Sequence, residues 1–366
     1  MSLLCLTLAA GCGGASSGES PAGEGAEGPT QTAGAASGGG AQGDVASSVS
    51  IATHAVASSY HAVGSALASL ISSHSEVSAT VVPTAGPNAW MSDLEAGNVD
   101  FGILSVIDVG WAMEGGPGYE SEAENLRTVV QGAALYGSGM TVRADPGIER
   151  IEELEGLRVA SDYGGNVVSA RFMELGLESV GLSWDDVDAI PVADVSTGID
   201  ALRNGQIDAV SGASPTSSLL LDAHQATPVR ILPVGNYTPA DIADGVPSET
   251  QEIIDRLIPG ATLATQPAGT GMLEEETVLI QHRVQLVSSD HVTADTVYAV
   301  LDALWTHYED MHDAHPLAEW VPEDMVPAAL RAPYHEGAVQ FYEDQGVWTD
   351  EHQQAQQELL EQAAAG

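Results

Sequence analysis

Residues 48–74, SVSIATHAVASSYHAVGSALASLISSH, decide how this chain folds. Residues 49–52 are a short apolar run that predicts a β-strand, and a loop of small residues and hydroxyls follows at 53–59. The next apolar residues have the spacing of one buried helix face, at Val63, Leu67, Leu70 and Ile71. This strand, loop and helix place hydroxyls and unpaired amide N–H groups at a helix N-terminus, where a negatively charged ligand is favoured.

Composition and charge limit the classes of function. A chain of 366 residues is long enough for two domains or lobes. It has 52 Asp and Glu against 10 Lys and Arg, all ten of them arginine, and a formal net charge of −42. Nucleic acid is excluded as a natural partner because its phosphates would be repelled. We interpret the acidity as halophilic adaptation, since self-repulsion destabilises a compact state at low salt but is screened beyond ~3 Å at ~1 M salt.

The N-terminus resembles a secretion signal followed by a tether. Residues 1–12, MSLLCLTLAAGC, are similar to the end of a bacterial lipoprotein signal with Cys12 as the lipidated residue. The positive segment is missing and the apolar segment is short, which a start assigned too far downstream would explain; the competing interpretation is a disordered apolar terminus. Residues 13–47 are rich in Gly, Ala and Ser and predict a flexible tether. No later run approaches the ~18 apolar residues of a membrane span, so we expect membrane contact only through the lipid.

The rest of the chain alternates strands with helices in two sets. The first set includes strands at 79–82 and 100–104 and a helix at 88–96. The second set starts at Gly147, and its Asn166 is placed to cap the helix that begins at Val167. Its strands are expected at 157–160, 188–192, 207–210 and 229–232. Such alternation predicts a largely parallel sheet with flanking helices in each set.

We therefore expect an α/β fold with two lobes. Lobe 1 takes residues 48–143 plus 241–346, lobe 2 takes 144–240, and residues 347–366 form a polar tail. A mobile segment is predicted at 236–276, and the long strand at 277–287 is placed to return the chain to lobe 1.

The ordered pieces resemble the TAXI family of TRAP-transporter solute-binding proteins over roughly residues 48–346. The stretches that carry the resemblance are IATHAVASSYHAVGSALASLI, PTAGPNAW, LEAGNVDFGIL, VRADPGIERIEELEGLRVA, SDYGGNVVSARFMELGL, LRNGQIDAVSGASP, QPAGTG, DAHP and PYHEGAVQFYEDQG. The resemblance implies the type II periplasmic-binding-protein fold, with two lobes that close about a hinge on a ligand in the interlobe cleft. It also implies a monomeric extracytoplasmic receptor, without cofactor or catalysis, that delivers glutamate, 2-oxoglutarate or a similar carboxylate to a sodium-driven permease.

The expected ligand-binding set combines positions matched to the family with residues placed near them. Ser59 and Tyr60 stand where the family has its Thr-Tyr pair, and residues 163–166 stand where it has a Gly-Ser-Gly-Thr anion loop. The whole set is Ser58, Ser59, Tyr60, His61, Trp90, Ser105, Gly164, Gly165, Asn166 and Ser214. Departures from the family pattern cluster at these ligand-contacting positions, whereas the scaffold positions match. We therefore expect the receptor role to be retained and leave the identity of the solute open.

Several residues have competing interpretations. Arg171 can clamp a carboxylate from the second-lobe helix, but an exposed arginine paired with an acid is the favoured interpretation. His54 and His61 can bind ligand or sense pH, and Trp111 is expected in the core. A metal site was considered at His307, His312 and His315 with Asp310 and Asp313, but their spacing fixes no third ligand, so no metal is expected.

Two rival functions remain at this point. One is a ligand-sensing module of the same fold that reports occupancy to a signalling partner. The other is an enzyme on the same scaffold, for which the body of the chain offers no G-x-S-x-G elbow and no dinucleotide fingerprint.

Overall fold

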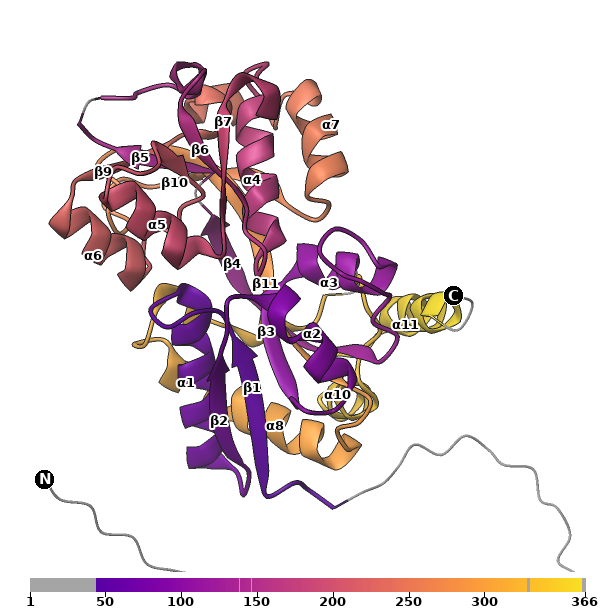
Figure 1. The fold of residues 1–366 in the computed structure, drawn as a ribbon. Helices are drawn as coiled ribbons and strands as arrows, with labels where there is room; N and C mark the ends of the chain where they lie inside the picture. Colours follow the sequence, from indigo (N-terminus) through magenta and orange to yellow (C-terminus); the bar gives the residue numbers. More distant parts are fainter. Residues whose placement is uncertain (1–43, 138, 146, 328–329, 364–366) are drawn as a thin grey trace, which may run out of the picture. The chain divides into compact units, whose positions relative to one another are not determined.

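A computed structural model describes residues 44–366 except 138, 146, 328–329 and 364–366 (Figure 1). The lipoprotein-type signal with Cys12, and residues 13–43 of the predicted tether, lie outside the described residues. Within the described part, no helix has the length and apolar character needed to cross a membrane.

The first sheet contains the strand predicted at the start of the chain. β1 (Ser48–Thr53) pairs in parallel with β2 (Ser78–Pro83) and β3 (Phe101–Ser105). β3 pairs antiparallel with β11 (Thr277–Ser289), which also pairs with β10 (Thr262–Gln266) and with β4 (Leu126–Gly137). The strand order is β10-β11-β3-β1-β2, with β4 on β11. The long strand therefore does return the chain to the first sheet, as expected.

Helix α1 (Ser59–His74) follows β1 and buries the predicted apolar face. Val63, Leu67 and Ile71 are fully buried in one core with residues of β1, β3 and α8 (Ala294–His307). The same lobe contains α2 (Pro87–Glu95), α3 (Val106–Glu114) and α10 (Glu336–Asp344). The i, i+4, i+8 spacing was a reliable guide because burial on one side is what stabilises such a helix.

The second sheet forms around its own core. Its order is β7-β6-β8-β5-β9, in which β6 (Arg158–Asp162) runs parallel to β7 (Asp188–Val192) and β8 (Ala209–Val210). β5 (Met140–Arg143) runs antiparallel to β8 and to β9 (Val229–Leu232). Its helices are α4 (Val167–Glu178), α5 (Val195–Arg203) and α6 (Ser218–Ala226).

Strand β5 corrects one predicted boundary. Residues 140–143 were assigned to lobe 1 as the end of 48–143, but β5 pairs with β8 and β9 of the second sheet, and Met140 and Val142 are buried in the second core. We therefore propose that lobe 2 begins near Met140. A short apolar run next to another strand does not reveal which sheet it joins, because both sheets bury apolar residues equally well.

The segment predicted as mobile, 236–276, contains regular structure. It includes α7 (Ser248–Leu257) and strand β10. Ile254 and Leu257 of α7 share a core with Phe172 of α4 and Val278 of β11. Short helical turns fill the remaining connections: Ile151–Leu154, Trp184–Asp186, Val234–Asn236, Pro239–Ile242, Tyr308–Met311 (η5), Pro316–Ala318 and Pro322–Met325.

The polar tail is a helix that docks on the first lobe. α11 (Asp350–Ala363) places Gln356 against the backbone of Tyr334, where the amide side chain accepts from its N–H at 2.7 Å and donates to its C=O at 2.9 Å. Both backbone groups of Tyr334 are thereby satisfied by one side chain, as buried backbone polar groups require.

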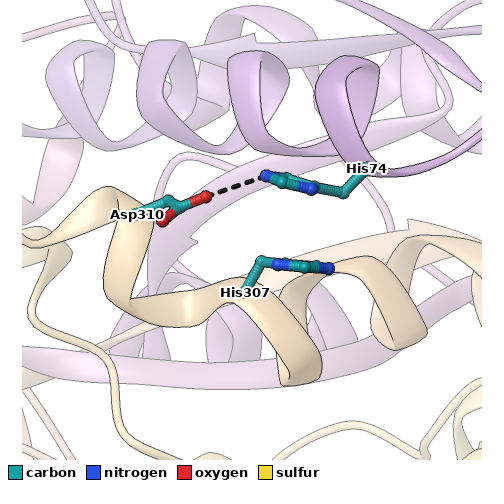
Figure 2. Close-up of side chains that lie close together, drawn as sticks. All are labelled: His74, His307 and Asp310. Atoms are coloured by element: carbon teal, nitrogen blue, oxygen red, sulfur yellow. Dashed lines mark hydrogen bonds and ion pairs between the residues drawn. The ribbon is translucent and has the colours of Figure 1, made fainter.

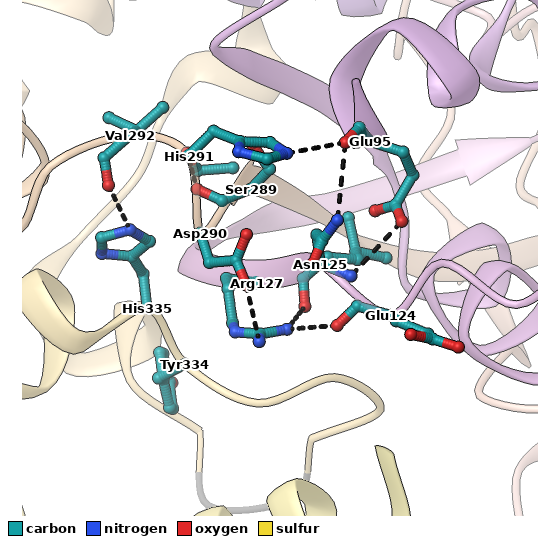
Figure 3. Close-up of polar contacts among 12 residues, drawn as sticks. Glu95, Glu124, Asn125, Arg127, Ser289, Asp290, His291, Val292, Tyr334 and His335 are labelled. Carbon is teal, nitrogen blue, oxygen red and sulfur yellow. Dashed lines mark hydrogen bonds and ion pairs between the residues drawn. The ribbon is translucent and has the colours of Figure 1, made fainter. Parts of the chain in front are cut away.

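Arg127, the first cation of the chain, joins several segments of the first lobe (Figure 3). Its guanidinium donates to the carbonyl oxygen of Glu124 at 2.7 Å and pairs with Asp290 at 3.3 Å. Nearby, Nε2 of His335 lies 3.0 Å from the carbonyl oxygen of Val292. These contacts tie the start of β4 to the end of β11 and to the segment that leads into α10.

Candidate functional site

A cavity lies where the loop after β1 meets α4 and α5 of the second lobe. It holds about 80 Å³ that the centre of a water-sized molecule can occupy, which is room for several waters or a small solute. The first lobe lines it with His54, Ala55, Ser58, Ser59, Tyr60, Ala85, Asp108, Leu135 and His282, together with Gly137 at the end of β4. The second lobe contributes Asn166, Val168, Ser169, Phe172, Asp194, Val195, Ser196, Gly212, Ala213, Ser214 and Leu219.

The start of α1 presents donors to this cavity. Ser58 caps the helix, and its Oγ accepts a hydrogen bond from the backbone N–H of His61 at 3.1 Å. Ser59 is buried, and its Oγ has no hydrogen-bond partner within the described chain. A buried hydroxyl without a partner is costly, so the geometry suits a ligand atom that completes it.

A pair of histidines and a tyrosine form one wall. The rings of His54 and Tyr60 stack with centroids 4.0 Å apart, and the Tyr60 hydroxyl lies 3.1 Å from Nε2 of His282. Nε2 of His54 and Nδ1 of His282 are buried and lack a partner among the residues that the structure describes. Burial lowers the pKa of His54 to about 3 and that of His282 to about 4. Both rings are therefore neutral at physiological pH and can each donate or accept one hydrogen bond.

Asp108 contributes a carboxyl group from the first turn of α3. The Ser105 hydroxyl donates to its Oδ2 at 2.6 Å and the Tyr119 hydroxyl donates to its Oδ1 at 3.0 Å. Burial raises the pKa of Asp108 to about 6, although these hydrogen bonds favour the charged form. Asp108 thus brings negative charge to a cavity that was expected to hold an anion.

The lining offers no side-chain cation to balance that charge. None of the described residues that line the cavity is an arginine, and the chain contains no lysine. Arg171 is not a lining residue and forms an ion pair with Glu174 one turn along α4. The favoured interpretation of Arg171, an arginine paired with an acid, therefore describes its contact. Asp194 also lines the cavity, where it caps α5 by accepting from the N–H of Thr197 at 2.7 Å.

The two lobes touch beside the cavity. The side chain of Asn166 reaches His54 with Nδ2 and Nδ1 3.4 Å apart, and Val167 donates its backbone N–H to Asn88 Oδ1 at 3.0 Å. A Cβ on Gly86, whose φ is +156°, would lie 2.2 Å from the carbonyl oxygen of Gly165. The close approach of these two loops therefore requires glycine at Gly86.

Asn166 differs from the sequence prediction in one respect. It stands at the N-cap of α4 as predicted, but its side chain makes no capping hydrogen bond and lies against His54 instead. Gly164 and Gly165 of the same loop are not among the lining residues. The loop therefore contacts the opposite lobe more than it faces the cavity.

Other expected site residues lie at or away from the cavity. Ser214 lines it, with Oγ 3.0 Å from Oγ1 of Thr216. Ser105 supports the cavity through Asp108, and His61 places Nδ1 3.3 Å from Oγ1 of Thr53 without lining it. Trp90 is 1% exposed and packs on Gly102, where a Cβ would approach its ring to 2.2 Å. Trp90, expected in the ligand-binding set, is therefore part of a core and does not line the cavity.

Trp111 is buried in a hydrophobic core, as expected. The histidines near residue 312 do not converge: His312 lies 3.0 Å from the carbonyl oxygen of Trp320, and His315 accepts from the N–H of Leu317 at 2.9 Å.

Sequence reasoning missed Asp108 and His282 as site residues. Asp108 follows Ser105 by three positions at a helix start, which is the pattern of a cap and an acidic first turn. His282 interrupts an otherwise apolar strand, which is a signal that could have been read. The sequence could not predict that these side chains lie at the same cavity, because contacting residues such as Tyr60 and His282 are 222 positions apart.

Comparisons with known proteins support the fold. A profile of the NMT1-like family matches residues 51–346. MatC from Rhodopseudomonas palustris with bound malate is 12% identical, with 86% of this chain and 98% of that chain covered and a TM-score of 0.53. R. palustris Rpa4515 with adipate is 14% identical, with 87% and 97% covered and a TM-score of 0.50. Identities this low show a shared fold alone, and the predicted α/β fold is confirmed.

Proposed function

The chain belongs to the NMT1-like family, and from this premise we propose that it is an extracytoplasmic solute receptor. It binds a small organic acid or an acidic amino acid between its lobes and delivers it to the sodium-driven permease of a TAXI-type TRAP transporter. The bound malate of MatC and the adipate of Rpa4515 support a carboxylate as the ligand class. In this proposal the protein performs no catalysis, acts as a monomer and needs no cofactor.

The observation that carries the proposal is the cavity lined by both lobes. Unpartnered donors or acceptors of Ser59, His54 and His282 surround it, and Ser58, Ser59 and Tyr60 at the start of α1 line it. A ligand that contacts both lobes prefers the closed arrangement, and its binding therefore shifts an open–closed equilibrium toward closure. A lipid on Cys12 and a tether over 13–47 would hold such a receptor at the outer face of the membrane.

Asp108 sharpens the choice among carboxylates. Glutamate and 2-oxoglutarate both carry two carboxylates, and no described lining residue is a side-chain cation that could pair with either group. The two ligands differ in the ammonium group of glutamate, which can pair with Asp108. The ligand carboxylate is then held by Ser59 and the amides at the start of α1, because a helix N-terminus favours negative charge. We therefore favour an amino acid such as glutamate over a keto acid such as 2-oxoglutarate.

Calorimetry in ~1 M salt against glutamate, 2-oxoglutarate, malate and adipate tests the proposal. We expect glutamate to bind with micromolar affinity, about −8 kcal/mol, and 2-oxoglutarate more weakly. Asp108→Asn should weaken glutamate by about tenfold or more and leave 2-oxoglutarate unchanged or tighter. Recovery of unaltered ligand after long incubation separates a receptor from an enzyme.

Asp194→Asn is the matched control. It removes a second carboxylate from the same cavity, but asparagine caps a helix as well as aspartate does, so α5 keeps its start. We expect it to change the preference for glutamate less than Asp108→Asn does, because Asp194 is more exposed than Asp108 and its charge is better screened. If none of the four acids binds, the ligand class is wrong; if Asp108→Asn leaves the preference intact, only the role of Asp108 is wrong.

A further inference from the structure

His74 lies beside His307 and Asp310 on the surface of the first lobe, although it is 236 positions from Asp310 in the sequence (Figure 2). His74 is the last residue of α1, His307 is the last residue of α8, and Asp310 lies in the turn η5 that follows α8. His74 Nε2 lies 2.8 Å from Asp310 Oδ2, and the rings of His74 and His307 stack with centroids 3.7 Å apart. We propose that these three side chains form a binding site for a divalent transition-metal ion such as Zn²⁺.

The spacing fits three ligands on one ion. One ligand atom from each residue lies within 4.8 Å of the other two. Among the residues that the structure describes, this is the only group of three or more His, Cys, Asp or Glu side chains with such spacing. Zinc bonds to nitrogen and oxygen are about 2.0–2.2 Å long, so small side-chain rotations bring all three atoms onto one ion. The His74 and Asp310 side chains are 28% and 61% exposed, so an ion in solution can reach them.

The donor set selects the kind of metal. Two imidazoles and one carboxylate are ligands of zinc sites that leave a fourth position for water or another group. Imidazole suits Zn²⁺, Cu²⁺ and Ni²⁺, whereas Mg²⁺ and Ca²⁺ prefer sites built from oxygen alone. This separates the three side chains from the many exposed carboxylates of the chain, which attract any cation without selecting one.

Two helix ends add to the preference for a cation. His74 and His307 each end a helix, and the C-terminal end of a helix carries partial negative charge. α1 and α8 pack in the same core, so both ends face the same side-chain cluster. A bound ion would join these two helices, which also share apolar core contacts and the stacked rings of His74 and His307.

The position of the site separates it from solute binding. α1 begins at the cavity with Ser59 and Tyr60 and ends at His74, and a helix of 16 residues is about 24 Å long. The ion would therefore sit at the opposite end of α1 and fasten this helix to α8. We expect it to stabilise the first lobe, because an ion that binds only the folded state shifts the unfolding equilibrium.

Titration of the full chain with ZnCl₂, after removal of metals with a chelator, tests the site. Work in ~1 M salt screens diffuse binding to acidic residues, and MgCl₂ and CaCl₂ serve as hard-cation comparisons. We expect one equivalent of Zn²⁺ to bind, a rise in Tm with Zn²⁺ and no such rise with Mg²⁺ or Ca²⁺. Co²⁺ in place of Zn²⁺ should give the visible absorption of a four-coordinate ion.

Variants assign the site to these residues. The variants His74→Gln, His307→Gln and Asp310→Asn should each weaken the affinity for Zn²⁺ by about tenfold or more. The control is His291→Gln, which should leave this affinity unchanged. His291 is an exposed histidine bonded to the carbonyl oxygen of Glu95. His74→Gln and Asp310→Asn change exposed side chains, so their metal-free Tm checks that the fold is intact. Absence of stoichiometric Zn²⁺ binding to the wild type, or unchanged Zn²⁺ affinity in the three variants, would overturn the proposal.

Discussion

Two histidine pairs in the same lobe behave as different chemical groups. His54 and His282 are buried beside the solute cavity, and burial holds the pKa of each far below 6.5. His74 and His307 lie stacked at helix ends with Asp310 at the surface. The comparison teaches that burial, and not residue type, decides whether a histidine here is a neutral hydrogen-bonding wall or an accessible ligand.

The largest difference should appear on acidification. In the unfolded chain both buried histidines titrate near pH 6.5, but in the fold their pKa values are about 3 and 4, so the unfolded state binds more protons below pH 6.5. Stability from this source is complete above pH 6.5 and is lost as the pH falls, by about 2 kcal/mol per histidine between about pH 6.5 and 5. Urea unfolding of the wild type and of His282→Gln in high salt, at several pH values, measures this loss. Because the variant has one buried histidine in place of two, its free energy of unfolding should fall by about half as much through histidine protonation.

Asp108 provides a control, because its pKa shift changes stability with pH in the direction opposite to that of the two histidines. Its pKa is raised from 3.8 to about 6, so between those values the folded state binds the extra proton and gains stability as the pH falls. Asp108→Asn removes this gain. The loss in the free energy of unfolding on acidification to about pH 5 should therefore be about 1 kcal/mol larger in the variant than in the wild type. If the free energy of unfolding depends on pH in the same way for the wild type, His282→Gln and Asp108→Asn, the cavity is open to water and the burial argument is wrong.

Tyr60→Phe tests the hydrogen bond between the Tyr60 hydroxyl and Nε2 of His282. It removes the hydroxyl that lies 3.1 Å from His282 Nε2, and Nδ1 of that ring already lacks a partner among the described residues. Leaving a second buried nitrogen unsatisfied should lower the free energy of unfolding by about 1–3 kcal/mol. Chemical denaturation at neutral pH measures the loss. A change close to zero would mean that water replaces the hydroxyl.

Asp310→Asn should have the smallest effect on the metal-free protein. The His74–Asp310 pair is exposed, and exposed ion pairs contribute about 0–1 kcal/mol, which salt reduces further. Its Tm without metal should match the wild type in high salt and differ at most slightly in low salt. A loss as large as that of Tyr60→Phe would contradict the contrast between the two histidine pairs.

Local sequence signals predicted much of the fold correctly. The spacing of Val63, Leu67 and Ile71 identified α1, and the long apolar strand near residue 280 was placed correctly in the first sheet. Strand β5 was assigned to the wrong sheet because a four-residue run of Met140–Arg143 carries no information on its partner. Trp90 was expected in the ligand-binding set, yet Gly102 makes room for its ring in a core.

The candidate site was foreseen only where it is local. Ser58, Ser59 and Tyr60 stand where the loop after β1 leads into α1, so a loop at a helix start was sufficient to find them. Asp108 and His282 come from α3 and β11, and their approach to Tyr60 depends on how the sheet pairs β11 with β3. His74 and Asp310 are 236 positions apart, so no spacing rule could join them.

By itself the sequence determined the acidic, lysine-free charge, the alternation of strands and helices and the hydroxyls at the start of α1, because these depend on composition and on neighbours along the chain. The tertiary structure alone decided which polar groups share a cavity, which lose water and which stay exposed. Desolvation and close contact depend on the distances between atoms in space. Residues far apart in the chain acquire those distances only when the two sheets have formed.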